Sequence, residues 1–204
     1  LYTFRYAVAF NSELEWDTSK VVIMEDTFAG SSSFDQPLAW DTSSVASMSG
    51  TFSEAYSFNR PLVWDTSKVT NMKKTFAYAG DMDAYVGGME PYSFNQPLEW
   101  DTSQVTTMSE TFRSNEAFNQ ELEWDTSKVA TMKDMFRGAV SFDQPLNWDT
   151  SKVRELRKAF DGAQAFNQRG IADWDVSRVL DMESTFDDTA LENDACSKQM
   201  LAAS

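Results

Sequence analysis

The sequence predicts an α/β repeat solenoid, and three observations lead to that expectation. Seven tryptophans recur at spacings of 24, 24, 36, 24, 24 and 26 residues. All fifteen phenylalanines fall into two fixed slots of the same repeat. Each copy also changes from an alternating apolar pattern to one with steps of three and four residues. Periodicity of this length is typical of stacked repeats that share one continuous core.

The third copy shows how each unit is expected to fold. Leu62 and Trp64 alternate around Val63, which predicts a short strand with one buried face. The apolar residues that follow have the spacing of an amphipathic helix or helical turn: Val69, Met72, Phe76 and Ala79. The polar sequence at 65–67 would cap that helix. We therefore expect about seven strand–helix coils, with parallel strands roughly 4.8 Å apart in a short sheet.

The repeats predict one domain that spans the whole chain, residues 1–204. Residues 1–9 supply a partial repeat or cap, and residues 10–186 hold seven repeats interrupted by an insertion at 80–91. Residues 187–204 are expected to form a closing cap or tail. Because one unit has too few apolar residues to bury itself, we expect the Trp and Phe rings of successive coils to stack inside.

The repeat also resembles a known family. The string from Phe94 to Met108, followed by Phe112, is similar to the short-repeat subtype of the BspA-like leucine-rich-repeat surface proteins. The resemblance implies a leucine-rich-repeat-like solenoid with a short parallel sheet on its concave side. It also implies adhesion or protein binding without a catalytic site. The chain departs from the pattern at the 80–91 insertion, at Leu156 in the Met slot and at 169–172.

Composition argues against an enzyme. The chain has no histidine, which is the commonest general base and a frequent zinc ligand. Its single cysteine, Cys196, cannot form an internal disulfide or a structural zinc site. No glycine-rich phosphate loop or nucleophile elbow is present. We expect no catalytic residues and no cofactor.

Charge and hydropathy limit the class of partner. The formal net charge is −15, from 32 acidic and 17 basic residues. This charge would repel a polyanion, so the sequence predicts a protein partner and no nucleic acid. If the chain is an accessory subunit, that partner belongs to a larger complex. No apolar stretch approaches the ~20 residues of a membrane span. The compartment stays open: the resemblance favours the cell surface, and a peripheral subunit of an organellar or membrane assembly is the other setting.

Two polar rows recur at fixed places in the repeat. One is an aspartate ladder, with one residue per copy: Asp17, Asp41, Asp65, Asp101, Asp125, Asp149 and Asp175. We interpret these aspartates as caps that accept hydrogen bonds from the following turn, and a row of calcium sites is the alternative. The other row follows the first Phe slot and is expected to satisfy backbone groups of the next coil: Asn11, Asp35, Asn59, Asn95, Asn119, Asp143 and Asn167.

Function is expected where the repeat varies. The residue between Leu and Trp points away from the core and forms a predicted concave strip: Glu15, Ala39, Val63, Glu99, Glu123, Asn147 and, by the Trp register, Asp173. The insertion offers a second protein-binding candidate through its apolar residues: Met82, Tyr85, Val86 and Met89. The preferred function is a non-catalytic binding or scaffold module, either an accessory subunit or an adhesin-like surface module. The alternative is a calcium- or carbohydrate-binding module.

Overall fold

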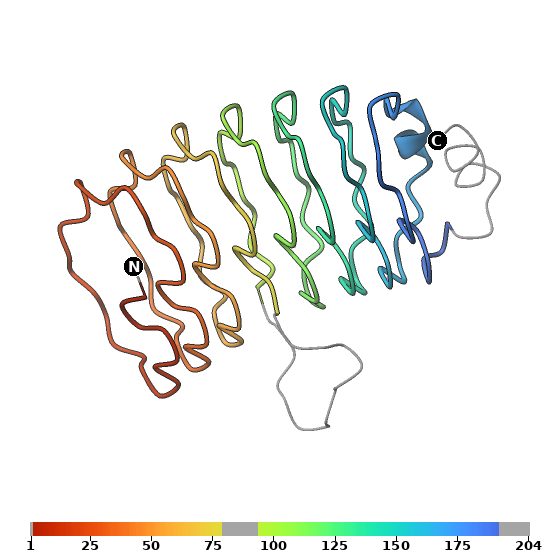
Figure 1. Ribbon diagram of the computed structural model, residues 1–204. Coiled ribbons are helices and arrows are strands. Elements are labelled where there is room, and N and C mark those ends of the chain that lie inside the picture. The colour runs from red at the N-terminus through yellow and green to blue at the C-terminus, as the bar shows by residue number, and fades with distance from the viewer. Residues whose placement is uncertain (1, 79–93, 192–204) are drawn as a thin grey trace.

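Each copy of the repeat makes one winding, and successive windings stack along one direction (Figure 1). The computed structural model describes residues 2–78 and 94–191. We number the windings by their tryptophans, from winding 1 with Trp16 to winding 7 with Trp174. Windings 3 and 4 stack like the others although their tryptophans are 36 residues apart, because Trp64 and Trp100 lie 6.3 Å apart, close to the other spacings.

The predicted helices are wrong. The only helix among the described residues is a 3-10 helix, η2, at Arg169–Asp173. In place of the expected helices lie tight turns, which occur in pairs where both are described. In winding 2, the N–H of Thr51 donates to the C=O of Met48 and the N–H of Ala55 donates to Phe52. The third residue of each turn has a positive φ, as in type II turns, at +63° for Gly50 and +59° for Glu54.

These turns stack through hydrogen bonds between windings. The N–H groups that the turns leave unused donate to the next winding, as Phe112 does to the C=O of Met135 at 2.9 Å. A helix would instead direct that N–H to Met108, four residues earlier in its own winding. Non-glycine residues with positive φ cost roughly 1–2 kcal/mol each. The cross-winding bonds join every pair of neighbouring windings from winding 1 to winding 7 and offset that cost.

The predicted parallel sheet is also wrong. Among residues 2–78 and 94–191, parallel pairing is reduced to isolated bridges of one residue per winding, along Ile23, Ser47, Asn71, Thr107, Thr131, Glu155 and Asp181. These bridges lie after the Val slot and not in the Leu–Trp segment. The Leu–Trp segments are extended, but their main link is the indole N–H, which Trp124 donates to the C=O of Leu98 at 3.2 Å. The indole therefore takes the place of a backbone ladder.

The aromatic core follows the prediction. Equivalent rings of neighbouring windings stack nearly parallel, with Phe52 and Phe76 5.6 Å apart at 2°. The tryptophans from Trp40 to Trp174 expose 5–8% of their surface. The exceptions lie in the first windings, where Phe4 and Phe10 are partly buried and Trp16 is 48% exposed. The interior of the stack is thus a set of aromatic columns.

The Asn/Asp row satisfies backbone groups of the next winding, as predicted. The Oδ1 of Asn95 accepts the N–H of Asn119 at 2.9 Å and the side-chain amide of Gln120 at 3.0 Å. Only an acceptor is needed, so Asp35 fills the same role toward the N–H of Asn59. Threonines add a similar link, because the hydroxyl of Thr102 donates to the C=O of Asp125.

Asn115 is a buried polar residue without the hydrogen bonds that the Asn/Asp row makes, and it tests how much such bonds contribute to stability. Its side chain is fully buried, and neither its Nδ2 nor its Oδ1 has a hydrogen-bond partner. Ala55, Ala139 and Ala163 occupy this slot in other windings. An unpaired buried amide costs about 1–3 kcal/mol, part of which is recovered through packing. Asn115→Ala should therefore raise the free energy of unfolding by about 1 kcal/mol, measured by urea denaturation.

The reverse change is the matched control. Ala139→Asn, made at the same slot one winding later, should lower the free energy of unfolding by about 1–3 kcal/mol. A loss of stability in Asn115→Ala would contradict the unpaired state of the Asn115 amide.

The spacing between windings differs on the two sides of the stack. Neighbouring rings of the second Phe slot lie 5.3–5.7 Å apart. The indoles lie 6.1–6.4 Å apart. The stack therefore curves with the Trp side outside and the turn ladder inside, and Figure 1 shows the windings set along an arc. The prediction of a concave Leu–Trp strip is wrong in this respect.

Candidate functional site

The residues between Leu and Trp form one outward row on the outer side of the stack. Val63 is 96% exposed, whereas its neighbours Leu62 and Trp64 are 4% and 6% exposed. The same alternation places the predicted site residues side by side, one per winding: Glu15, Ala39, Val63, Glu99, Glu123 and Asn147. We call these six residues the outer strip. Asp173 is also exposed but lies at the end of η2.

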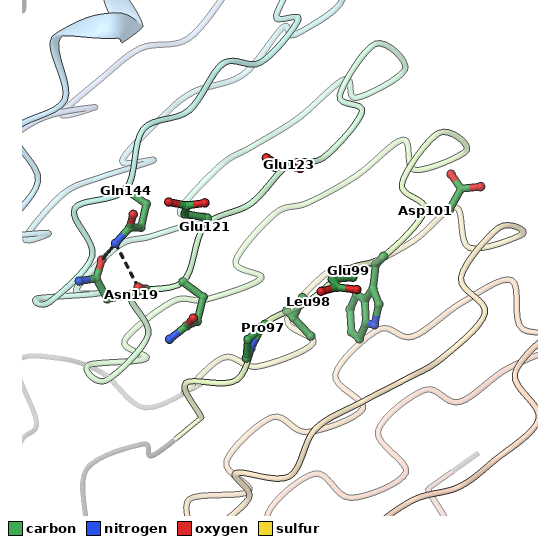
Figure 2. Close-up of a pocket in the computed structure, with 10 residues that line it drawn as sticks. Pro97, Leu98, Glu99, Asp101, Asn119, Glu121, Glu123 and Gln144 are labelled. Atoms are coloured by element: carbon green, nitrogen blue, oxygen red, sulfur yellow. Dashed lines mark hydrogen bonds between the residues drawn. The ribbon is translucent and has the colours of Figure 1, made fainter.

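The outer strip is hollowed between windings. One hollow, of about 840 Å³, lies between windings 4 and 5. Figure 2 shows the carboxylates of two neighbouring windings around it, Glu99 and Asp101 on one and Glu121 and Glu123 on the next. At one end, the side-chain amide of Gln144 donates to both the Oδ1 and the backbone C=O of Asn119. The buried residues Leu98 and Trp100 also line this hollow.

Two smaller hollows lie on the same side. One of about 380 Å³ lies between windings 5 and 6, beside Glu123 and Asn147. Another of about 430 Å³ lies between windings 1 and 2, beside Glu15 and Ala39. The three hollows lie on the side where the windings are farther apart. They form there because no backbone ladder draws neighbouring Leu–Trp segments together.

The carboxylates of the outer strip lack cationic partners. In the described part of the chain, no ion pair involves Glu15, Glu99 or Glu123. Ion pairs concentrate at the turn ladder, where Glu110 lies 3.2 Å from both Lys74 and Arg113. The outer strip is therefore an acidic surface whose charge is not neutralised from within.

The aspartate ladder is engaged in the turns that follow it. The Oδ1 of Asp125 accepts the N–H of Ser127 at 2.9 Å, and the hydroxyl and N–H of Ser127 together lower the pKa of that carboxyl. The equivalent Ser bonds lower the pKa of the other six ladder aspartates. The capping interpretation holds in this form, although a turn and not a helix follows.

The calcium and sugar alternatives receive no support from this geometry. Across residues 2–78 and 94–191, no three acidic or cysteine side chains converge to hold a metal ion. A sugar platform needs an exposed indole, and Trp16 is the only described tryptophan that is more than 8% exposed.

The lowered pKa of the ladder predicts a specific pH response. A carboxyl whose folded pKa lies below its unfolded value stabilises the fold above the unfolded pKa, and this contribution is lost as the pH falls through the folded pKa. Ser127→Ala should raise the pKa of Asp125 toward its ordinary value of about 3.9. Carboxyl chemical shifts followed by NMR titration measure this directly. Asp149, capped by Ser151, is the internal control and should not change. An Asp125 titration that is the same in both proteins would contradict the capping role.

Comparison with known proteins identifies the family. The family model described as "Mycoplasma protein of unknown function, DUF285" matches residues 2–95 and 80–199. The chain belongs to the DUF285 family. No curated protein and no solved structure matches this DUF285 chain. In its described part, no helix is long and apolar enough to cross a membrane.

The sequence analysis did not predict some residues that line the hollows, and some of its predicted residues are not described by the structure. Glu13 and Glu121 line the hollows from the slot that holds proline in most copies, and that departure from the repeat was the available signal. The insertion candidates lie outside the described residues: Met82, Tyr85, Val86 and Met89.

Proposed function

We propose that this DUF285 chain is a non-catalytic protein-binding module that holds its partner on the outer strip. The observation that carries the proposal is the coincidence, on one side, of exposed variable residues, hollows between windings and unneutralised carboxylates. The invariant aromatic slots are already used by ring stacking, and the turn slots are used by hydrogen bonds between windings. A rigid stack with a variable face is suited to binding an extended surface.

Two settings fit this proposal. The resemblance to short-repeat BspA-like surface proteins favours an adhesin-like module at the cell surface. An accessory subunit of a larger assembly is the other setting, and it would use the same strip. In both, the partner is a protein and not a nucleic acid, because a net charge of −15 repels phosphates.

A selection experiment tests the proposal even though the partner is unidentified. A displayed peptide library would be panned against the folded chain and counter-selected against the triple variant Val63→Asp, Glu99→Gln and Glu123→Gln. The recovered peptides should bind the parent chain at least about tenfold more tightly than the variant, which corresponds to about 1.4 kcal/mol.

A control variant removes two carboxylates elsewhere, as the triple variant does, without a change at Val63. Glu116→Gln with Asp187→Asn removes two negative charges outside the outer strip. This control should bind the recovered peptides as the parent does. If every recovered peptide binds the triple variant and the parent equally, the outer strip is not the binding surface and the proposal fails.

A further inference from the structure

The spacing of the outer strip matches the repeat of an extended peptide. Indoles of neighbouring windings lie 6.1–6.4 Å apart, so successive strip residues advance by nearly the same distance. Two residues of an extended chain advance about 6.6 Å, and their side chains point to the same face. A peptide laid along the stack therefore places every second side chain over a new winding, with only a small slip per step.

The strip has a defined order of side chains from winding 1 to winding 5. It is acidic at Glu15, apolar at Ala39 and Val63, then acidic again at Glu99 and Glu123. The complement is a segment that reads basic, apolar, apolar, basic, basic at alternate positions. Opposite charges placed over the hollows would neutralise carboxylates that the chain itself leaves unpaired.

The hollow between windings 1 and 2 is lined by a tryptophan whose indole N–H lacks an acceptor. Trp40 lines this hollow and is 8% exposed, and its indole N–H has no hydrogen-bond partner. The equivalent indoles, from Trp64 to Trp174, donate to a Leu carbonyl of the preceding winding at 3.1–3.2 Å. This nitrogen is itself buried, so a peptide on the strip contacts the part of the Trp40 ring that lines the hollow, and the Trp40 indole reports whether the hollow is occupied.

The backbone of the strip is also unpartnered. The N–H and C=O groups of Ala39, Val63, Glu99 and Glu123 make no hydrogen bond within the described part of the chain. A partner's polar groups can therefore meet them without breaking any existing bond.

We propose that the outer strip binds an extended basic segment with Lys or Arg, two apolar residues, then two further Lys or Arg at alternate positions. This inference rests on the proposed function and adds the chemistry of the partner. The segment spans windings 1 to 5, with one contacting side chain per winding. An anionic ligand is disfavoured there because the strip carries three carboxylates and no base.

Synthetic peptides test the inference. The sequence Lys-Thr-Val-Thr-Val-Thr-Lys-Thr-Lys and its reversal present the pattern in the two chain directions. Lys-Lys-Lys-Thr-Thr-Thr-Thr-Val-Val has the same composition and charge without the alternation. Fluorescence anisotropy should show at least one alternating peptide binding about tenfold more tightly than the control peptide. Equal binding of all three would overturn the inference, because charge alone would then explain the affinity.

Variants of the chain locate the contact. Glu99→Gln with Glu123→Gln should weaken the alternating peptide about tenfold, whereas Glu116→Gln with Asp187→Asn should leave its affinity within about twofold. The indole N–H resonance of Trp40 should shift on binding, and that of Trp174 should not. An unchanged Trp40 resonance, or equal effects of the two double variants, would also overturn the inference.

The outcome is distinguishable from failure of the proposed function. Library peptides that require the outer strip but lack alternating basic residues would leave protein binding standing and remove the basic-segment inference. Library peptides whose binding does not depend on the outer strip would contradict both the proposed function and the basic-segment inference.

Discussion

Replacing Trp124 with alanine should lower the free energy of unfolding by about 3–5 kcal/mol, the usual loss for a large aromatic core residue. Trp124 is 5% exposed, stacks on Trp100 at 6.4 Å and on Phe112 at 5.9 Å, and donates its indole N–H to Leu98. The substitution removes a link in two aromatic columns and leaves the Leu98 carbonyl without its donor. Guanidinium denaturation followed by circular dichroism measures the loss.

Trp16 provides the matched comparison. It occupies the same slot in winding 1 but is 48% exposed, and it stacks on Trp40 at 6.2 Å from one side. Trp16→Ala should cost about 1–2 kcal/mol, because about half of the ring is already in water. Equal losses in the two variants would show that burial does not set the energetics of the tryptophan column.

Replacing Asn95 with leucine is the second large effect, and it tests the polar row. The Oδ1 of Asn95 accepts both the N–H of Asn119 and the amide of Gln120. Leucine has nearly the same size and no acceptor, so the N–H of Asn119 loses its partner. The free energy of unfolding should fall by about 1–3 kcal/mol in urea denaturation.

Asn95→Asp separates hydrogen bonding from size. Asp35 and Asp143 already fill this slot and accept the equivalent N–H groups at 3.0 and 2.9 Å. The neighbours of Asn95 in the row, Asn59 and Asn119, are neutral, so a new carboxylate meets no like charge there. The aspartate variant should stay within about 0.5 kcal/mol of the parent. A loss as large as that of the leucine variant would contradict the acceptor role.

The sequence was sufficient to predict the core because aromatic residues mark it without ambiguity. Rings confined to two Phe slots and one Trp slot are buried when equivalent rings of successive copies stack on one another. The Asn/Asp row was predictable for a similar reason: alternation of Asn and Asp in one slot indicates an acceptor whose own donors are not needed. The exposure of Val63 between Leu62 and Trp64 followed from period-two alternation.

The local conformation was not predictable from spacing, because turns and helices share it. In winding 2, Thr51 and Phe52 follow Met48 by three and four residues, as in a helical stripe, and two successive four-residue turns bury all three. The glycines carry the signal that separates the two. Gly30, Gly50, Gly138 and Gly162 fall in the turn positions with positive φ, and glycine disfavours a helix interior.

The strip was predictable as a set of residues but not as a shape. Alternation fixes which side chains point outward, whereas the curvature depends on how closely each side can approach its neighbour. Indoles that bond to the Leu carbonyls hold the Leu–Trp segments apart, and backbone bonds draw the turns together. That balance places Glu99 and Glu123 on the outer side and opens the hollows between windings. Repeat spacing alone contains no information on the curvature of the stack.

An NMR experiment that detects scalar coupling across hydrogen bonds distinguishes stacked turns from helices. Each winding is a run of turns joined to the next winding by backbone hydrogen bonds, and every other feature of the stack depends on that ladder. We therefore expect coupling from the amide of Phe112 to the carbonyl of Met135, 23 residues later. Coupling from Phe112 to the carbonyl of Met108 would instead establish a helix and contradict the turn ladder.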